Sequence, residues 1–96
     1  MYELHYTTAA EKYFKKVKEK GLKQAFQAAL LAISDDPYIG SAKVGDLSGL
    51  HGYDVYYNKT NYEIAYRIYE EDGQLVVVLL AGTRENFYNE LKRYLK

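Results

Sequence analysis

The most constraining feature of the sequence is a continuous apolar run from Leu75 to Ala81 that is rich in valine. Such a short β-branched run is typical of a strand that is buried on both faces and lies inside a sheet. It breaks at Gly82-Thr83, and the segment that follows has apolar residues at helical spacing, which should pack this helix on the sheet: Phe87, Leu91, Tyr94 and Leu95. A buried strand therefore leads directly into an amphipathic helix. Arg84 and Tyr88 stand at this junction, where the edge of a rigid sheet can hold a functional site.

Size and composition favour one small globular domain spanning residues 1–96. Hydrophobic residues make up 48% of the chain, so a packed core is expected rather than disorder. No apolar run approaches the roughly 20 residues that cross a membrane, and the first residues lack the pattern of a signal peptide. The chain has no cysteine and hence no disulfide framework or thiolate site. We expect a cytoplasmic protein without a membrane partner.

One segment of this electrically neutral chain is strongly basic. Residues 11–23 contain six lysines against two glutamates, although the formal net charge of the whole chain is +0. The lysines are Lys12, Lys15, Lys16, Lys18, Lys20 and Lys23. They either form a surface that meets a phosphate backbone or make up an ordinary solvated helix face, and charge alone leaves both readings open.

The first half of the chain predicts a strand followed by two helices. Tyr2 to Tyr6 alternates as a strand does. Thr8 and Glu11 fit a capping box with Thr8 as the N-cap, so a helix should begin there, and Gly21 should end it. A second helix follows almost at once and should end near residues 34–35, because Pro37 disfavours helical geometry in the residue before it. The two helices form a hairpin that needs a sheet to cover its apolar side.

The second half predicts three strands and a terminal helix. Residues 36–52 read as a loop, and strands are expected over residues 53–57, 62–69 and 75–81. Turns are expected at residues 58–61 and at Asp72-Gly73. The order is therefore β-α-α-β-β-β-α. It predicts an α+β fold with a small, mostly antiparallel sheet, an N-terminal helical hairpin on one face and a C-terminal helix.

Alternation along residues 62–69 divides the side chains between the two faces of this sheet. The residues expected to face the helical hairpin are Tyr62, Ile64, Tyr66 and Ile68. The residues expected on the opposite face are Glu63, Ala65 and Arg67, with Asp54 and Tyr56 from the neighbouring strand. We expect this second face to stay partly open, with Arg84 and Tyr88 at its end.

Three local patterns occur in an order that a known protein family shows. Leu47-Ser48-Gly49 precedes a tyrosine-rich strand, and Tyr62 to Tyr66 reads Tyr-Glu-Ile-Ala-Tyr. Ala81 to Arg84 reads Ala-Gly-Thr-Arg and runs into Phe87-Tyr88 and a terminal helix. Together with the order of elements, these patterns make the chain resemble the RelE/ParE superfamily of bacterial toxins from type II toxin–antitoxin systems. The resemblance covers essentially the whole chain.

This resemblance implies a small toxin that a cognate antitoxin neutralises. RelE-like members enter the ribosomal A site and cut mRNA without a metal. ParE-like members share the fold, lack the nuclease residues and poison DNA gyrase. No cofactor is expected. A zinc site is not expected either, because zinc usually takes at least three protein ligands and the chain offers two histidines and no cysteine at suitable spacing.

Metal-free RNA cleavage needs a base for the 2′-hydroxyl, a proton donor for the leaving oxygen and a cation on the phosphate. Arg84 matches the family's phosphate-binding arginine. Tyr88 matches its terminal-helix tyrosine, which stacks on a base or assists proton transfer. The alternatives are a surface arginine paired to an acid and a tyrosine that, with Phe87, anchors the helix to the sheet.

Several positions depart from the RelE pattern. Glu63 stands where the family's third strand carries an arginine, and Asp54 and Tyr56 stand where RelE-like second strands carry basic residues. In one hypothesis Glu63 or Asp54 is the general base. In the other, Glu63 forms a cross-strand ion pair with Arg67 or Arg84. Contacts to RNA are assigned to Tyr56, Arg67 and the six lysines of residues 12–23.

The favoured interpretation is a ribosome-dependent, metal-independent mRNA endoribonuclease that inhibits translation. Its partners would be a cognate antitoxin, the ribosome and mRNA. One alternative is a ParE-like toxin that inhibits DNA gyrase, and another is a degenerate member that binds its antitoxin and little else. Arg84 together with Tyr88 favours the nuclease, whereas the neutral net charge and the acids on the second face keep the alternatives open.

Overall fold

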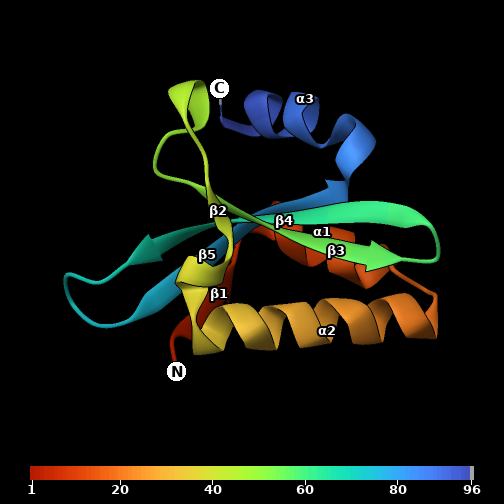
Figure 1. Cartoon of the computed structure of the whole chain (residues 1–96), viewed down its shortest axis with the longest axis horizontal. Coiled ribbons are helices and arrows are strands. Elements are labelled where there is room, and N and C mark those ends of the chain that lie inside the picture. Colours follow the sequence, from red (N-terminus) through yellow and green to blue (C-terminus); the bar gives the residue numbers. More distant parts are fainter. Residues whose placement is uncertain (96) are drawn as a thin grey trace.

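The computed structural model describes residues 1–95 and has the α+β fold that the sequence predicts (Figure 1). The strands are β1 (Glu3–Tyr6), β2 (Ser41–Ala42), β3 (His51–Tyr57), β4 (Thr60–Tyr69) and β5 (Leu75–Thr83), and the helices are α1 (Thr8–Lys16), α2 (Lys20–Asp35) and α3 (Arg84–Leu95). The predicted order is confirmed. The segment expected to be a loop additionally contains β2 and two 3₁₀ turns, Pro37–Ile39 and Gly45–Leu47. Within the described chain, none of the helices has the length and apolar character needed to span a bilayer.

Strand β5 lies inside the sheet, as its apolar sequence predicts. The strand order is β1-β5-β4-β3-β2, with β1 parallel to β5 and the other pairs antiparallel. Both faces of β5 are covered: Val76 and Val78 are fully buried on the side of α1 and α2, and Leu80 packs on the side of α3 in an apolar cluster that includes Phe87 and Leu91. A strand with neighbours on both edges and both faces excludes water, which explains its continuous apolar run.

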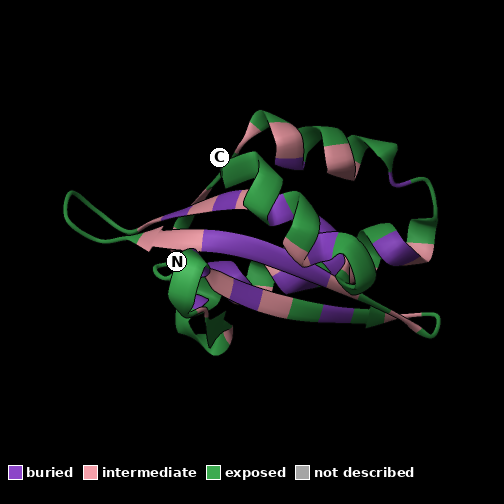
Figure 2. Ribbon diagram, turned by 90° about the horizontal axis from the view of Figure 1, so that it is seen from above, coloured by how far each residue is buried: buried purple, intermediate pink, exposed green. Residues whose placement is uncertain are grey.

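The helical hairpin covers one face of the sheet, as predicted. Phe26 and Ile33 of α2 pack against Ile64 and Tyr66 of β4, and these four side chains are at most 2% exposed. Figure 2 shows the buried positions concentrated along the sheet and on the sides of the helices that face it. Burying side chains of this size stabilises a fold by about 1.5–3 kcal/mol each, so this cluster is the main core.

The opposite face is covered along β4 but stays open at β3, where Asp54 and Tyr56 are exposed, so the expectation of a partly open face is confirmed at β3 alone. Phe87 and Leu91 of α3 are completely buried against Ala65 of β4, together with Leu47 and Leu50 from the loop before β3. The next turn of α3 makes no equivalent contact. Its side chains Tyr94 and Leu95 are 44% and 42% exposed, so the prediction that they pack on the sheet is wrong. Helix α3 is therefore held on the sheet mainly by Phe87 and Leu91, which lie one turn apart on the same side of the helix.

Two predicted helix boundaries are also wrong, because tertiary contacts decide them. The N-cap of α1 is Thr7 rather than Thr8: the Thr7 hydroxyl accepts from the Ala10 N–H at 3.1 Å and donates to the Leu79 carbonyl at 2.6 Å. This second bond ties the helix start to β5. Gly21 does not end α1 but lies in the first turn of α2, where a Cβ atom would collide with the Tyr57 ring.

The turn between β3 and β4 is shorter than predicted and has a strained backbone. Tyr57 pairs with Thr60, so the turn consists of Asn58 and Lys59 alone. Their φ angles are 49° and 65°. Two successive positive φ values are the signature of a type I′ hairpin turn, whose second position favours glycine. A lysine at that position is therefore held in a conformation that costs energy.

Replacing Lys59 with glycine should stabilise the protein by about 1 kcal/mol, because glycine adopts a positive φ without a steric penalty. The expected rise in Tm is roughly 4–8 °C, measured by thermal unfolding. Lys18→Gly is the matched control: Lys18 is an exposed lysine between helices with no positive φ, so this change should lower stability. Equal effects of the two substitutions would contradict the account of the turn.

Tyr66 predicts a loss of stability at alkaline pH. Its ring is fully buried, its hydroxyl donates to the Pro37 carbonyl at 2.6 Å, and burial raises the pKa of Tyr66 to about 12. The unfolded state releases this proton near pH 10, so stability should fall as pH rises from about 10 to 12. The contribution at pH 11 is on the order of 1 kcal/mol, measurable by urea unfolding at pH 8 and 11. Tyr66→Phe should reduce this pH dependence, whereas Tyr69→Phe on the exposed end of β4 should not.

Candidate functional site

The junction between β5 and α3 brings Arg84 into contact with an acid, as one of the two sequence interpretations expects. Arg84 is the first residue of α3 and follows β5 without a loop. Its guanidinium Nη1 lies 3.1 Å from both carboxylate oxygens of Asp54 on β3. The two side chains are 48% and 59% exposed, so the pair is open to solvent and to a competing anion. A pair this exposed contributes little to stability.

Glu63 lies directly opposite Asp54 in the register of β3 and β4, on the same face of the sheet. Facing residues of an antiparallel pair have Cβ atoms only about 4.5–5.5 Å apart, so the two side chains leave the sheet next to each other. Their exposure nevertheless differs: Glu63 is 1% exposed, whereas the side chain of Asp54 is mostly in solvent. The sequence-derived expectation that both acids lie on an open face therefore holds for Asp54 alone.

The partner of Glu63 is Lys43, a residue that sequence reasoning missed. The Lys43 ammonium lies 2.6 Å from the Glu63 carboxylate and donates a hydrogen bond of 2.7 Å to the hydroxyl of Tyr88. It also sits 4.8 Å from the centre of the Tyr88 ring, in the range of a cation–π contact. The expected ion pairs of Glu63 with Arg67 or Arg84 are not formed within the described chain. The available signal was that Lys43 is an isolated cation, the sole lysine or arginine between Lys23 and Lys59.

Gly52 of β3 makes room for this ion pair. A Cβ atom at this position would collide with the Glu63 carboxylate and would lie 2.6 Å from Cε and 2.9 Å from Nζ of Lys43. Both charged side chains therefore cross the backbone of β3 where it carries no side chain. Gly52 also pairs with Ser41 of β2, so the strand that ends next to Lys43 is held in place at the same point.

The environment keeps Lys43 charged. Burial of the ammonium opposes its charge, but the hydrogen bonds to Glu63 and Tyr88 outweigh this penalty and raise the pKa of Lys43. The Lys43 side chain is 14% exposed, so its charge acts in surroundings with little water. Electrostatic interactions are stronger in such surroundings than in bulk solvent. Lys43 can therefore hold the Tyr88 hydroxyl in place and stabilise negative charge that develops on its oxygen.

The other predicted contact residues are distributed over the molecule. Tyr56 is 67% exposed and follows Asp54 on the same face of β3. Arg67 lies on the same face of β4 as Glu63 and approaches the loop at Gly49. The six lysines of residues 12–23 are all exposed, on α1, α2 and the link between them. These helices cover the face of the sheet opposite α3, so the six lysines lie on a different side from Lys43, Glu63 and Tyr88.

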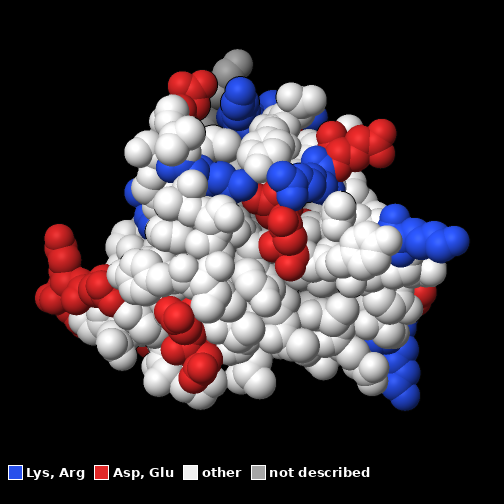
Figure 3. All heavy atoms as spheres, in the orientation of Figure 1, with Lys and Arg blue, Asp and Glu red and all other residues white. Residues whose placement is uncertain are grey.

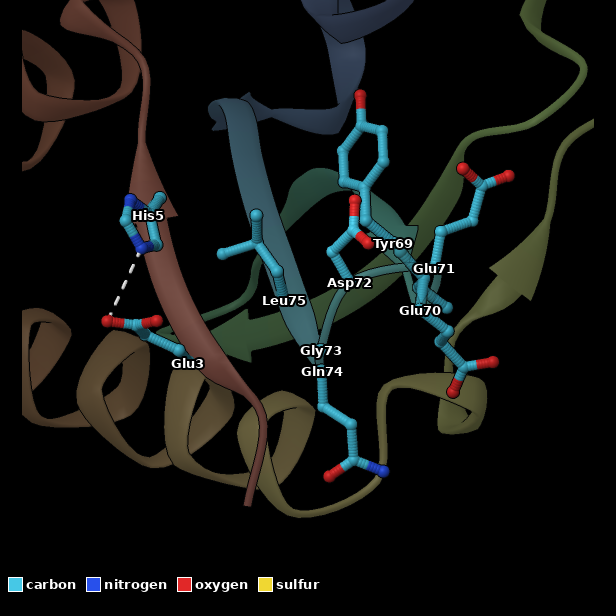
Figure 4. A pocket seen from close by; sticks show the side chains of 10 residues that line it. Glu3, His5, Tyr69, Glu70, Glu71, Asp72, Gly73, Gln74 and Leu75 are labelled. Atoms are coloured by element: carbon cyan, nitrogen blue, oxygen red, sulfur yellow. Dashed lines mark ion pairs between the residues drawn. The ribbon is translucent and has the colours of Figure 1, made fainter.

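Two hollows in the surface differ in charge. One of about 700 Å³ lies beside the turn between β4 and β5, and its acidic lining residues are Glu3, Glu70, Glu71 and Asp72. Their side chains point in different directions around the rim (Figure 4) and, within the described chain, form no group suited to a metal ion. The other, of about 450 Å³, is lined by Lys59 and Arg84 among others and adjoins the Asp54 pair. In the view of Figure 3, acidic side chains protrude at the left-hand end of the molecule and basic ones at the right-hand end, where an acidic group also lies above them.

Comparison with known proteins identifies the fold and the family. A family model described as "ParE-like toxin of type II bacterial toxin-antitoxin system" matches residues 4–92, nearly the whole chain. The chain belongs to this toxin family. The comparison with curated proteins found no match.

Solved toxin structures share the architecture of this ParE-like toxin. A free mutant of the Escherichia coli toxin RelE aligns with a TM-score of 0.69 and 18% identity over 96% of both chains. In the intact E. coli RelBE toxin–antitoxin complex, the TM-score is 0.68 at 18% identity, over 85% of this toxin and 95% of that chain. The Mycobacterium tuberculosis complex RelBE2 gives 0.65 at 25% identity, over 86% of this toxin and 98% of that chain. The fold predicted from the sequence resemblance is thereby confirmed.

The ion pair of Lys43 and Glu63 should contribute more to the folding stability of the toxin than the exposed pair of Arg84 and Asp54 does. Lys43→Met leaves Glu63 buried and unpaired, which should destabilise the protein by about 3–5 kcal/mol. Adding Glu63→Gln removes the buried charge and should recover much of that loss. Urea unfolding of both single variants and the double variant forms a double-mutant cycle that measures the coupling. Additive effects of the two substitutions would show that the pair is not a coupled unit.

Proposed function

We propose that the toxin inhibits translation as a metal-independent endoribonuclease that cuts mRNA on the ribosome. The observation that carries the proposal is a cluster of two neighbouring contact groups at the junction of the sheet and α3: Arg84 with Asp54, and Lys43 with Glu63 and Tyr88. This cluster contains the three groups that RNA cleavage without a metal requires: a base, a cation for the phosphate and a proton donor.

Arg84 is assigned to the phosphate and Asp54 to the base. The guanidinium fork suits two phosphate oxygens, and both members of the exposed pair can be reached by RNA. When Arg84 turns to the phosphate, the Asp54 carboxylate loses its partner and becomes free to accept the proton of the 2′-hydroxyl. The 2′-oxygen then bonds to phosphorus, and the bond from phosphorus to the 5′-oxygen breaks.

Tyr88 is assigned to the leaving group. Its hydroxyl proton passes to the departing 5′-oxygen, and the Lys43 ammonium at 2.7 Å stabilises the resulting phenolate. The products are a 2′,3′-cyclic phosphate and a 5′-hydroxyl, and the proton taken by Asp54 balances the one given by Tyr88. Glu63 is too deeply buried to touch RNA, so it positions Lys43 rather than acting as the base.

The proposed partners are a cognate antitoxin and the ribosome. The solved E. coli and M. tuberculosis relatives are toxin–antitoxin complexes, and a cognate antitoxin that binds and neutralises this toxin is inferred from them. The six exposed lysines of residues 12–23 are assigned to ribosomal RNA. Their position on the side opposite α3 suits a toxin held between RNA surfaces. The proposed site uses no cofactor.

Inhibition of DNA gyrase is the second candidate, and one observation favours it. Both cations of the cluster are already paired with carboxylates, Arg84 with Asp54 and Lys43 with Glu63, so the site carries little net positive charge for RNA. A surface of this kind suits contact with a protein better than contact with a polyanion. The first candidate predicts cleaved mRNA in the cell, and the second predicts inhibited DNA gyrase.

Induced expression of the toxin should separate the two candidates. The expected result is cuts within codons of translated messages, mapped by primer extension, and normal gyrase supercoiling in a parallel assay. Arg84→Ala should abolish the cuts without unfolding the protein, a loss of about a hundredfold or more. Arg93→Ala, which removes an exposed arginine from the last turn of the same helix, should leave cleavage unchanged. Intact messages with inhibited supercoiling would instead establish the gyrase candidate.

A further inference from the structure

We infer that the hollow between the β3–β4 turn and the start of α3 binds one ribonucleotide of the RNA strand, next to the phosphate held by Arg84. This inference rests on the proposed function, because it identifies part of the substrate of the same site. The hollow lies at the right-hand end of the view in Figure 1, where the β3–β4 turn approaches the first turn of α3. Its volume of about 450 Å³ falls within the range of about 300–1,000 Å³ usual for small-ligand sites.

The lining offers a group for each part of a nucleotide. It consists of Lys59, Thr60, Asn61, Thr83, Arg84 and Glu85. The two cations suit a phosphate, and the two threonine hydroxyls suit the 2′-hydroxyl of a ribose. Asn61 can pair with the edge of a base, and the Glu85 carboxylate accepts from an exocyclic amino group while repelling a phosphate from that part of the hollow.

A stacking surface lies beside this lining. Tyr56 is directly opposite Asn61 in the register of β3 and β4, and its ring is 67% exposed. Exposed aromatic rings next to basic residues are the usual platform for unpaired bases. Tyr56 is two residues from Asp54, a separation of about 7 Å along the strand. A base on Tyr56 would therefore lie one nucleotide length or less from the phosphate that Arg84 holds.

The strained turn supports a role for the Lys59 side chain. Lys59 has a φ of 65°, a conformation that glycine adopts more easily. Keeping a lysine there costs stability, and strain of this kind is typical of functional positions. The side chain lines the hollow, which supplies a reason for the lysine.

The hollow also connects the cluster with the basic helices. Thr83 lines this hollow and a second one that is bordered by Lys16 and Lys18 of the helical hairpin. An RNA strand leaving the nucleotide site can therefore pass around the edge of the sheet to these lysines. Basic side chains protrude at this end of the molecule beside an acidic group (Figure 3). The linings of the two hollows together hold four cations against two carboxylates, Glu19 and Glu85, which gives such a path a favourable net charge.

Titration of the free toxin with each of the four ribonucleoside 5′-monophosphates tests this site without the ribosome. In ¹H–¹⁵N NMR spectra, the expected result is saturable shift changes of residues 59–61 and 83–85. Lys59→Gly and Asn61→Ala should each weaken binding by about tenfold, and Lys59→Gly should do so although it stabilises the fold. Lys92→Ala, an exposed lysine of α3 outside the hollow, is the matched control.

Shift changes confined to the lysines of residues 12–23, or none at nucleotide concentrations on the order of 10 mM, would overturn the inference. Equal binding by Lys59→Gly and the unsubstituted toxin would overturn it too. Cleavage assays then separate this site from the proposed function. Nucleotide binding in the hollow by a toxin that leaves mRNA intact would keep the site and reject the nuclease. An active nuclease whose preference for the cut codon does not change in Asn61→Ala would reject base reading in the hollow.

Discussion

The buried ion pair of Glu63 and Lys43 is the interaction on which the functional face of this toxin depends. A carboxylate that is 1% exposed in the central strand of a sheet is costly unless a cation accompanies it. Lys43 supplies that cation from the loop before β3, and Gly52 leaves the space in which the two charges meet. The same ammonium fixes the hydroxyl of Tyr88 on α3. One pair of charges thus joins a loop, the sheet and the last helix.

The sheet separates two kinds of packing. On one face, α1 and α2 bury a large apolar core, and among the described residues the single buried charged side chain, Glu63, lies on the other face. On the other, α3 is held by a smaller apolar cluster around Phe87 and Leu91, and the charged residues lie beside it. The rigid core positions the sheet, in which β3 carries Asp54 and β5 leads directly into the helix that carries Arg84 and Tyr88. This division places Arg84 and Tyr88 on a helix whose start is fixed by the most buried strand of the fold.

Sequence patterns predicted the order of the elements because periodicity and turn residues are local signals. They placed β5 inside the sheet and identified the α+β class, and they brought Arg84 and Tyr88 to one junction. Boundaries set by distant contacts were missed. Thr7 caps α1 because it also bonds to Leu79 on β5, which no local pattern reveals.

The site was only partly predictable for a related reason. Asp54 and Arg84 are thirty residues apart, and their contact depends on the register of β3 with β4 and on the docking of α3. The burial of Glu63 depends on two elements that cover the α3 side of the sheet, namely α3 itself and the loop before β3. Lys43 could not be assigned because it follows a strand of two residues that has no periodicity of its own. A lone cation in a glycine-rich segment is the clue that sequence reasoning can use in such cases.

The most direct measurement is the chemistry of the RNA ends that the toxin leaves on the ribosome. Purified ribosomes are programmed with a short mRNA of defined A-site codon, and the products are analysed by mass spectrometry after the toxin is added. The assignment of Asp54, Arg84 and Tyr88 predicts a single cut in that codon, with a 2′,3′-cyclic phosphate on one fragment and a 5′-hydroxyl on the other. An uncut message, or a fragment that carries a 5′-phosphate, would contradict it.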